Sequence, residues 1–224
     1  PERVASSLSA ERSKVLLNPE NLRPADGLHA LVQRLSRFAP WQDFAALDAC
    51  LIESFRFERD EVLWAGEDPD ERLFIISEGF AFDFAMLSGR KRHIFDFYGR
   101  GAICNWSRPA REDTSENIAF KARTEVSVLD RQRLTDLLAG EEGLARAIAD
   151  YELSRAMRVS QRVRALISLP ARDRLLILLL DLYDEFSATE DPRRWLPIPL
   201  TQEEIGDLIG TTSVHVSRTF STLE

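Results

Sequence analysis

The stretch at residues 200–224 constrains this chain more than any other, because it has the pattern of two short amphipathic helices around a tight turn. Thr201 precedes Glu204 by three residues, which is the capping-box spacing at the start of a helix. Gly210 suits the left-handed conformation that ends a helix. Two short helices joined by a turn that contains glycine form the helix-turn-helix pattern.

The second predicted helix, capped by Thr211 or Thr212, repeats apolar residues at Val216, Phe220 and Leu223. Its outward face is then small, polar and almost free of acid, although the whole chain carries a net charge of −8. In a helix-turn-helix, a second helix of this kind enters a DNA major groove. The pattern alone leaves an ordinary helical hairpin in a protein core equally open.

Length and composition bound the class of protein. The 224 residues and their apolar fraction of 44% are sufficient for two domains with real cores. The longest apolar run, residues 175–180, is far shorter than a membrane span. The polar start of the sequence lacks the features of a signal peptide. We therefore expect a cytoplasmic protein with no membrane partner.

Metal and catalytic signatures are sparse. Cys50 and Cys104 are the only cysteines, and His29, His93 and His215 are scattered singly. These counts exclude a four-cysteine iron–sulfur site and offer no paired zinc spacing. No glycine-rich nucleotide loop or nucleophile elbow occurs. We therefore expect that the chain is not an enzyme and binds no metal ion. The alternative is a cupin-like metal enzyme, because a β-rich region could hold a metal ion.

That β-rich region covers residues 55–129. Phe80, Phe82 and Phe84 alternate with smaller or polar residues, which is the period of a strand, and further short apolar segments follow between turns. Closely spaced strands of this kind predict a barrel or sandwich. Its aromatic side chains are expected to fill the core or to line a pocket for an apolar effector. The preceding residues 26–54 have helical spacing.

A long helix is predicted over residues 142–169, where Pro170 ends it. Small and apolar residues form a narrow stripe along it, with arginines around them. Such a stripe is typical of a helix that packs on a copy of itself, which predicts a homodimer, and packing on its own domain is the alternative. The residues predicted at the dimer interface are Ile148, Tyr151, Leu153, Ala156, Val159, Ser160, Val163 and Ile167.

The order of barrel, dimer-type helix and terminal helix-turn-helix resembles the Crp/Fnr family of bacterial transcription regulators. The segments that carry the resemblance are residues 73–79, 89–94, 98–101, 200–206 and 214–219. It implies an α+β fold with a cyclic-nucleotide-binding-like jelly-roll β-barrel, a long dimerisation helix and a winged helix-turn-helix. The expected boundaries are 1–25 for a loose lead-in, 26–140 for the barrel, 141–169 for the dimerisation helix and 170–224 for the DNA-binding domain. The sequence ends at Glu224, before the family's wing, so the wing is expected to be missing or truncated.

The resemblance also implies a sequence-specific regulator with three partners: a near-palindromic double-stranded DNA operator, a second copy of the chain and RNA polymerase. Arg218 occupies the position of the family's base- or phosphate-contacting arginine, which can fork onto guanine O6 and N7. Val214 replaces a frequent glutamate, so the family's common half-site is not expected. The predicted DNA contacts are Thr201, Gln202, Thr212, Ser213, Val214, His215, Ser217 and Arg218.

The identity of an effector cannot be inferred from the resemblance in the same way. Nucleotide-binding members place an Arg-Ser pair on the phosphate, and Glu116 and Asn117 fall in that slot here, where a carboxylate repels a phosphate. In a haem-sensing branch a histidine stands where this chain has Trp106. We therefore expect no cofactor, and a cyclic-nucleotide- or haem-responsive regulator is the alternative. The candidate effector pocket consists of Cys104, Trp106, Arg108, Arg111, Glu116 and Asn117.

Overall fold

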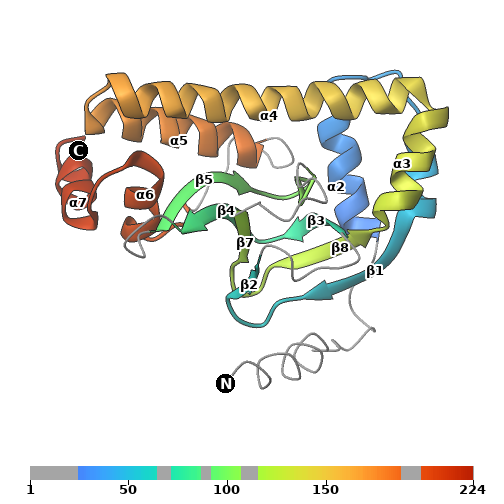
Figure 1. Cartoon of the computed structure of the whole chain (residues 1–224), viewed down its shortest axis with the longest axis horizontal. Helices are drawn as coiled ribbons and strands as arrows, with labels where there is room; N and C mark the ends of the chain where they lie inside the picture. The colour runs from blue at the N-terminus through green and yellow to red at the C-terminus, as the bar shows by residue number, and fades with distance from the viewer. Residues whose placement is uncertain (1–24, 65–71, 87–91, 107–115, 188–197, 224) are drawn as a thin grey trace.

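Two antiparallel four-stranded sheets lie below a long helix (Figure 1). The computed structural model describes residues 25–64, 72–86, 92–106, 116–187 and 198–223, so the predicted lead-in lies almost wholly outside the described residues. The first sheet has the strand order β1-β8-β3-β6 and the second has the order β2-β7-β4-β5. The strands are β1 (Leu51–Arg56), β2 (Glu61–Leu63), β3 (Leu73–Glu78), β4 (Ala81–Met86), β5 (Arg92–Tyr98), β6 (Ile103–Cys104), β7 (Glu116–Phe120) and β8 (Glu125–Leu129).

Apolar side chains fill the space between the two sheets. Phe74 and Val128 of the first sheet belong to the same buried cluster as Ile118 and Phe120 of the second. The rings of Phe74 and Phe120 meet edge to face, with 5.5 Å between their centroids. Two sheets that pack face to face through such a core form a jelly roll, so the predicted N-terminal jelly roll is confirmed.

The phenylalanines at positions 80, 82 and 84 do not face this inner core. Phe80, Phe82 and Phe84 are buried on the outer side of the second sheet, in a cluster with leucines of the C-terminal helices. The expectation that they are core residues is confirmed, but the core that they fill lies between the second sheet and the C-terminal helices and not inside the barrel. Period-two alternation identifies an apolar face of a strand but does not tell what covers that face.

The helices before the sheets are shorter than predicted. α2 spans Ala25–Leu35, and a 3₁₀ helix, η1, spans Ala45–Cys50. The predicted helical spacing up to residue 54 is wrong at its end, because Leu51 already begins β1 and pairs with Leu129 of β8. A run this short satisfies helical spacing and strand spacing about equally well.

The long helix is present as predicted. α4 (Glu142–Ser168) has 27 residues and follows α3 (Arg131–Gly140). After Pro170 the chain turns back, and α5 (Ala171–Ser187) runs along α4 on the side of the sheets (Figure 1). α4 therefore bridges the jelly roll and the C-terminal helices.

The C-terminal helices α6 (Gln202–Ile209) and α7 (Ser213–Ser221) dock with α5 on the outer face of the second sheet. Leucines and isoleucines of α5 and α6 cover the three phenylalanines. Two ion pairs flank this apolar contact. Arg92 on β5 lies 2.8 Å from Asp207, and Lys121 after β7 lies 3.0 Å from Glu204. The two regions are thus joined by both apolar and charged contacts.

A network of buried charges joins α2, β5, α4 and α5. Arg162 of α4 bonds Asp181 of α5 and Asp96 of β5, each at 2.7 Å. Arg155 bonds Asp96 as well and lies over the Tyr98 ring, 4.2 Å from its centroid. Among the described residues the network includes Arg34, Arg155, Arg158, Arg162, Asp96, Asp181 and Glu185.

Glu152 lies next to this network, and its Oε1 is buried without a hydrogen bond to the described residues. Burial raises its pKa to about 7, with Asp96 and Glu185 adding to the shift and Arg155 opposing it. The folded state then holds the proton more tightly than the unfolded state, so stability falls as the pH rises from about 4.5 to about 7. We predict that Glu152→Gln raises the free energy of unfolding by about 2–3 kcal/mol at pH 8 and leaves it unchanged at pH 4.

Urea unfolding at both pH values measures this difference. Asp150→Asn, which neutralises an exposed carboxylate on the same helix, is the control and should change the free energy of unfolding at pH 8 by no more than about 0.5 kcal/mol. An equal effect of Glu152→Gln at pH 4 and pH 8 would contradict the assigned pKa.

Candidate DNA-binding site

α6 begins with the complete capping box that the sequence predicts. The Thr201 hydroxyl accepts from the Glu204 backbone N–H at 3.2 Å, and the Glu204 carboxylate accepts from the Thr201 backbone N–H at 2.8 Å. The same Glu204 side chain pairs with Lys121 of the jelly roll. The first helix is therefore fixed at its start, both locally and against the jelly roll.

The turn between the helices depends on glycine, as expected. Gly210 ends α6 in the left-handed region at φ 64°, and Thr212 caps α7 by accepting from the His215 backbone N–H at 3.3 Å. Sequence reasoning missed a second requirement at Gly206. A Cβ at that position would lie 2.7 Å from the Thr211 carbonyl oxygen. Its only signal in the sequence is a glycine inside a short helix.

The two helices bury one face and expose the other. Ile205, Leu208, Ile209 and Val216 are buried against α5 and the jelly roll. All eight predicted DNA contacts are exposed, and they lie along α7 and at the start of α6. They are Thr201, Gln202, Thr212, Ser213, Val214, His215, Ser217 and Arg218. The helix pair is therefore not a hairpin enclosed in a core.

The charged side chains of α6 and α7 differ in whether they are paired. Among the described residues Arg218 makes no ion pair, whereas Glu204 and Asp207 of α6 are paired with Lys121 and Arg92. α7 contains no acidic residue. The exposed face of α7 therefore presents a guanidinium and hydroxyl groups to a partner, with no carboxylate of its own to repel an anion.

The predicted dimer residues divide between two sides of α4. Ile148 and Tyr151 are 1% and 3% exposed and lie in the core formed with α2 and η1. Both are therefore out of reach of a second copy, which corrects their assignment to the dimer interface. They lie about half a helix turn away from the outward stripe, and apolar character alone does not separate the two sides.

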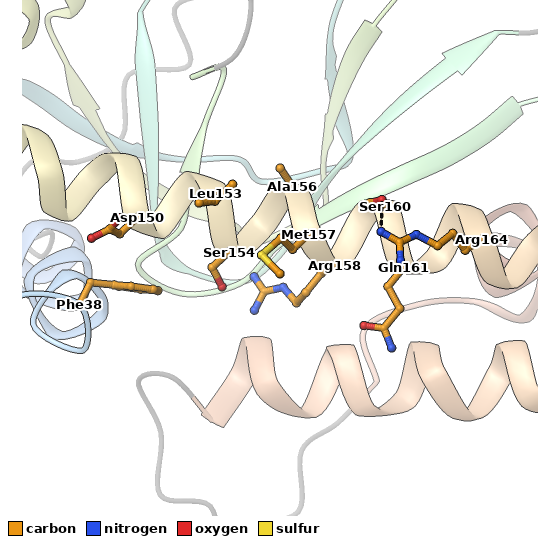
Figure 2. A pocket seen from close by; sticks show the side chains of 10 residues that line it. All are labelled: Phe38, Asp150, Leu153, Ser154, Ala156, Met157, Arg158, Ser160, Gln161 and Arg164. Atoms are coloured by element: carbon orange, nitrogen blue, oxygen red, sulfur yellow. Dashed lines mark hydrogen bonds between the residues drawn. The ribbon is translucent and has the colours of Figure 1, made fainter.

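The outward side of α4 carries an apolar row that we name the outer seam: Leu153, Ala156, Ser160, Val163 and Ile167. These exposed residues alternate three and four apart, and Leu153 and Ile167 are 59% and 82% exposed. Val159 is half-buried at its edge. Figure 2 shows part of the seam beside the exposed Met157, which sequence reasoning missed, at an open groove of about 850 Å³.

The structure does not gather the candidate effector residues into one site. Arg108 and Arg111 lie outside the described residues, and of Glu116 only its place at the start of β7 is described. Cys104 is buried between the sheets, whereas Trp106 packs against the cluster around α2. Asn117 is buried and donates to the Phe84 carbonyl at 3.4 Å. Burial raises the pKa of the Cys104 thiol well above its usual value, which disfavours the thiolate needed for haem ligation or redox chemistry.

Within the part of the chain that the structure describes, no three histidine, cysteine or acidic side chains are grouped closely enough to hold a metal ion. In the same part, no helix has the length and apolar character needed to cross a membrane.

Comparison with known proteins agrees with the assignment of α6 and α7 to a helix-turn-helix. Residues 173–224 match the model of the Crp-like helix-turn-helix domain. The transcriptional activator protein FnrA of Stutzerimonas stutzeri is 25% identical over 181 residues, which cover 80% of this chain and 74% of FnrA. The chain is thus similar to Crp/Fnr-type transcription regulators, and its C-terminal region matches their helix-turn-helix domain.

Solved structures share the fold of this chain. FixK2 from Bradyrhizobium japonicum superposes with a TM-score of 0.64 at 20% identity, and the match covers 76% of this chain and 83% of FixK2. CLP from Xanthomonas campestris, a c-di-GMP-responsive global regulator, has a TM-score of 0.62 at 18% identity, covering 81% of this chain and 91% of CLP.

The tight turn between α6 and α7 yields a prediction. Gly206→Ala would place a methyl group against the Thr211 carbonyl, so α6 and α7 must separate. We expect a loss of about 2 kcal/mol in the free energy of unfolding, measured by urea denaturation. Gly140→Ala, in α3 with no heavy atom within 4 Å of the new Cβ, is the control and should be neutral or stabilising by about 0.5 kcal/mol. Equal effects of the two changes would contradict the described turn.

Proposed function

We propose that the chain acts as a homodimer that binds a specific DNA sequence through α7. The observation that carries the proposal is the exposed, acid-free face of α7, held in place by the capped α6 and the glycine turn. In a helix-turn-helix the second helix lies in the major groove and the start of the first helix meets the backbone. The division into residues 26–140, 141–169 and 170–224 is part of this proposal.

Each exposed side chain then has a role. Arg218 donates to guanine O6 and N7, and Val214, 60% exposed, contacts a thymine methyl group. His215 reaches a phosphate or a base edge. Thr201 and Gln202 meet phosphates at the start of α6, where backbone N–H groups favour anions. Because valine replaces the acceptor common at its position, the operator differs from the family's most frequent half-site.

The outer seam of α4 supports a dimer. Its three-and-four spacing is that of a coiled coil, and it lies opposite the side that packs on the jelly roll. Two copies joined along it would present two α7 helices to successive major grooves about 34 Å apart on a near-palindromic site. Among the described residues, apolar side chains pack between the two sheets, which supports a regulator that is not controlled by a cyclic nucleotide.

The role of Arg218 is tested on DNA. An operator is first selected from random duplexes with the wild-type protein. We predict that Arg218→Ala weakens binding to that operator by about 1–3 kcal/mol and relaxes preference at one base position, because a bidentate contact is lost. Fluorescence anisotropy at fixed salt measures it. Arg37→Ala, another exposed arginine far from α7, should bind as the wild type does. Unchanged operator affinity in the Arg218 variant would refute its role.

The dimer is tested by placing a charge in the outer seam. We predict that Val163→Lys raises the dimer dissociation constant by about 100-fold or more, because two ammonium groups would be buried against each other. Sedimentation equilibrium measures the constant. Gln161→Lys adds the same charge on an exposed position outside the seam and should remain dimeric. A dimeric Val163 variant would show that the seam is not the interface.

A further inference from the structure

The end of α5 places a single carboxylate in a pocket built by other parts of the chain. Glu185 is 1% exposed. Its Oε1 accepts from the Gly99 backbone N–H at 2.9 Å and lies 3.0 Å from Arg34 Nη2. Its Oε2 accepts from Arg158 Nη2 at 3.2 Å, and Arg155 Nη1 lies 3.7 Å from Oε1. We call these four groups, three guanidinium groups and one backbone N–H, the arginine socket.

The socket donors are also held by bonds that do not involve α5. Arg34 Nε of α2 donates to the Arg100 carbonyl at 2.6 Å. Arg155 of α4 donates to the Phe97 carbonyl at 3.1 Å and stacks on the Tyr98 ring. Three structural units, α2, the segment after β5 and α4, therefore position the socket, and only its occupant comes from the C-terminal region.

The arginine socket fits the end of α5 closely in shape as well as in charge. A Cβ at Gly99 would lie 3.3 Å from Glu185 Cγ and 3.3 Å from a ring carbon of Phe186. Arg34 also donates to the Glu185 backbone carbonyl at 2.9 Å, so one guanidinium holds both the side chain and the end of the helix. The end of α5 is therefore fixed in position as well as in charge.

The electrostatic balance of the socket depends on α5 being docked. Burial alone raises the pKa of Glu185, but Arg34, Arg155 and Arg158 outweigh it and lower the pKa to about 2. Without this carboxylate, Arg34 and Arg158 make no ion pair with any other described residue. A buried charge that loses its partner is strongly destabilising. The docked arrangement therefore requires a charged group at position 185, beyond the apolar contact with Phe80, Phe82 and Phe84.

We propose that Glu185 is a latch that holds the DNA-binding region on the jelly roll, and that its release from the arginine socket frees α5, α6 and α7 to reorient. The latch connects α2 and the segment after β5 to the position of α7. Any event that moves Arg34 or Gly99 away from Glu185 thereby changes the position of the recognition helix. This control acts within one chain and is separate from the reading of DNA.

The three outer phenylalanines report the release, because leucines and isoleucines of the C-terminal helices cover them. Hydroxyl-radical footprinting with mass spectrometry measures their oxidation in the full chain. In Glu185→Gln we expect oxidation of Phe80, Phe82 and Phe84 to rise by about threefold or more, since an uncompensated buried charge disfavours docking. Phe74 and Phe120, buried between the sheets, should stay at wild-type levels.

Two further variants sharpen the test. Asp184→Asn removes the same charge from the adjacent exposed position and should match the wild type. Arg158→Gln removes a donor whose carboxylate partner is Glu185, so it should reproduce the pattern, and the double variant should show less than the product of the two single effects.

Unchanged oxidation of the three phenylalanines in Glu185→Gln would overturn the latch. An equal rise at Phe74 and Phe120 would overturn it too, because the change would then be loss of the fold. Multiplicative effects in the double variant would show that Glu185 and Arg158 do not act as one contact. None of these measurements uses DNA, so the latch and the proposed function fail independently.

Discussion

The inner side of α4 depends on arginines that are buried and paired. Arg155 and Arg162 reach Asp96 on β5, and Arg162 also reaches Asp181 on α5, so one helix face ties the jelly roll to the C-terminal region. Removing these charges from water costs several kcal/mol each, and only the attraction between correctly placed partners offsets that cost. The network therefore contributes less to net stability than to selecting one arrangement of the domains, because a partial arrangement leaves a charge buried and unpaired.

The two sides of α4 differ in what they contact. Its inner side, with Tyr151 and the arginines, packs on its own chain, and its outer seam is left to solvent in the single chain. Because the arginines fix the rotation of the helix about its axis, they also decide which apolar residues point outward. The direction of the seam is thus a consequence of charge pairing on the opposite side.

Features governed by local rules could be predicted from the sequence. The capping box at Thr201, the left-handed Gly210 and the long helix ended by Pro170 each follow from a few neighbouring residues, and each is present. The rest depends on what lies across space. Alternation could not tell which side of β4 would be covered, and Ile148 looked equivalent to Leu153 until their surroundings were known. Arginine side chains are usually solvent-exposed, so nothing in the local sequence indicates that these arginines form a buried charge network.

The single arginine on α7 has a consequence for how such a protein searches DNA. A body with a net charge of −8 repels the duplex at distances within a Debye length, about 8 Å at physiological salt. With few phosphate contacts, non-specific complexes are weak and depend little on salt, because few counterions are released. If the chain binds DNA as proposed, it would spend little time sliding along unrelated sequence. It would then find its operator mainly by repeated three-dimensional encounters, and recognition would rely on short-range fit at the bases.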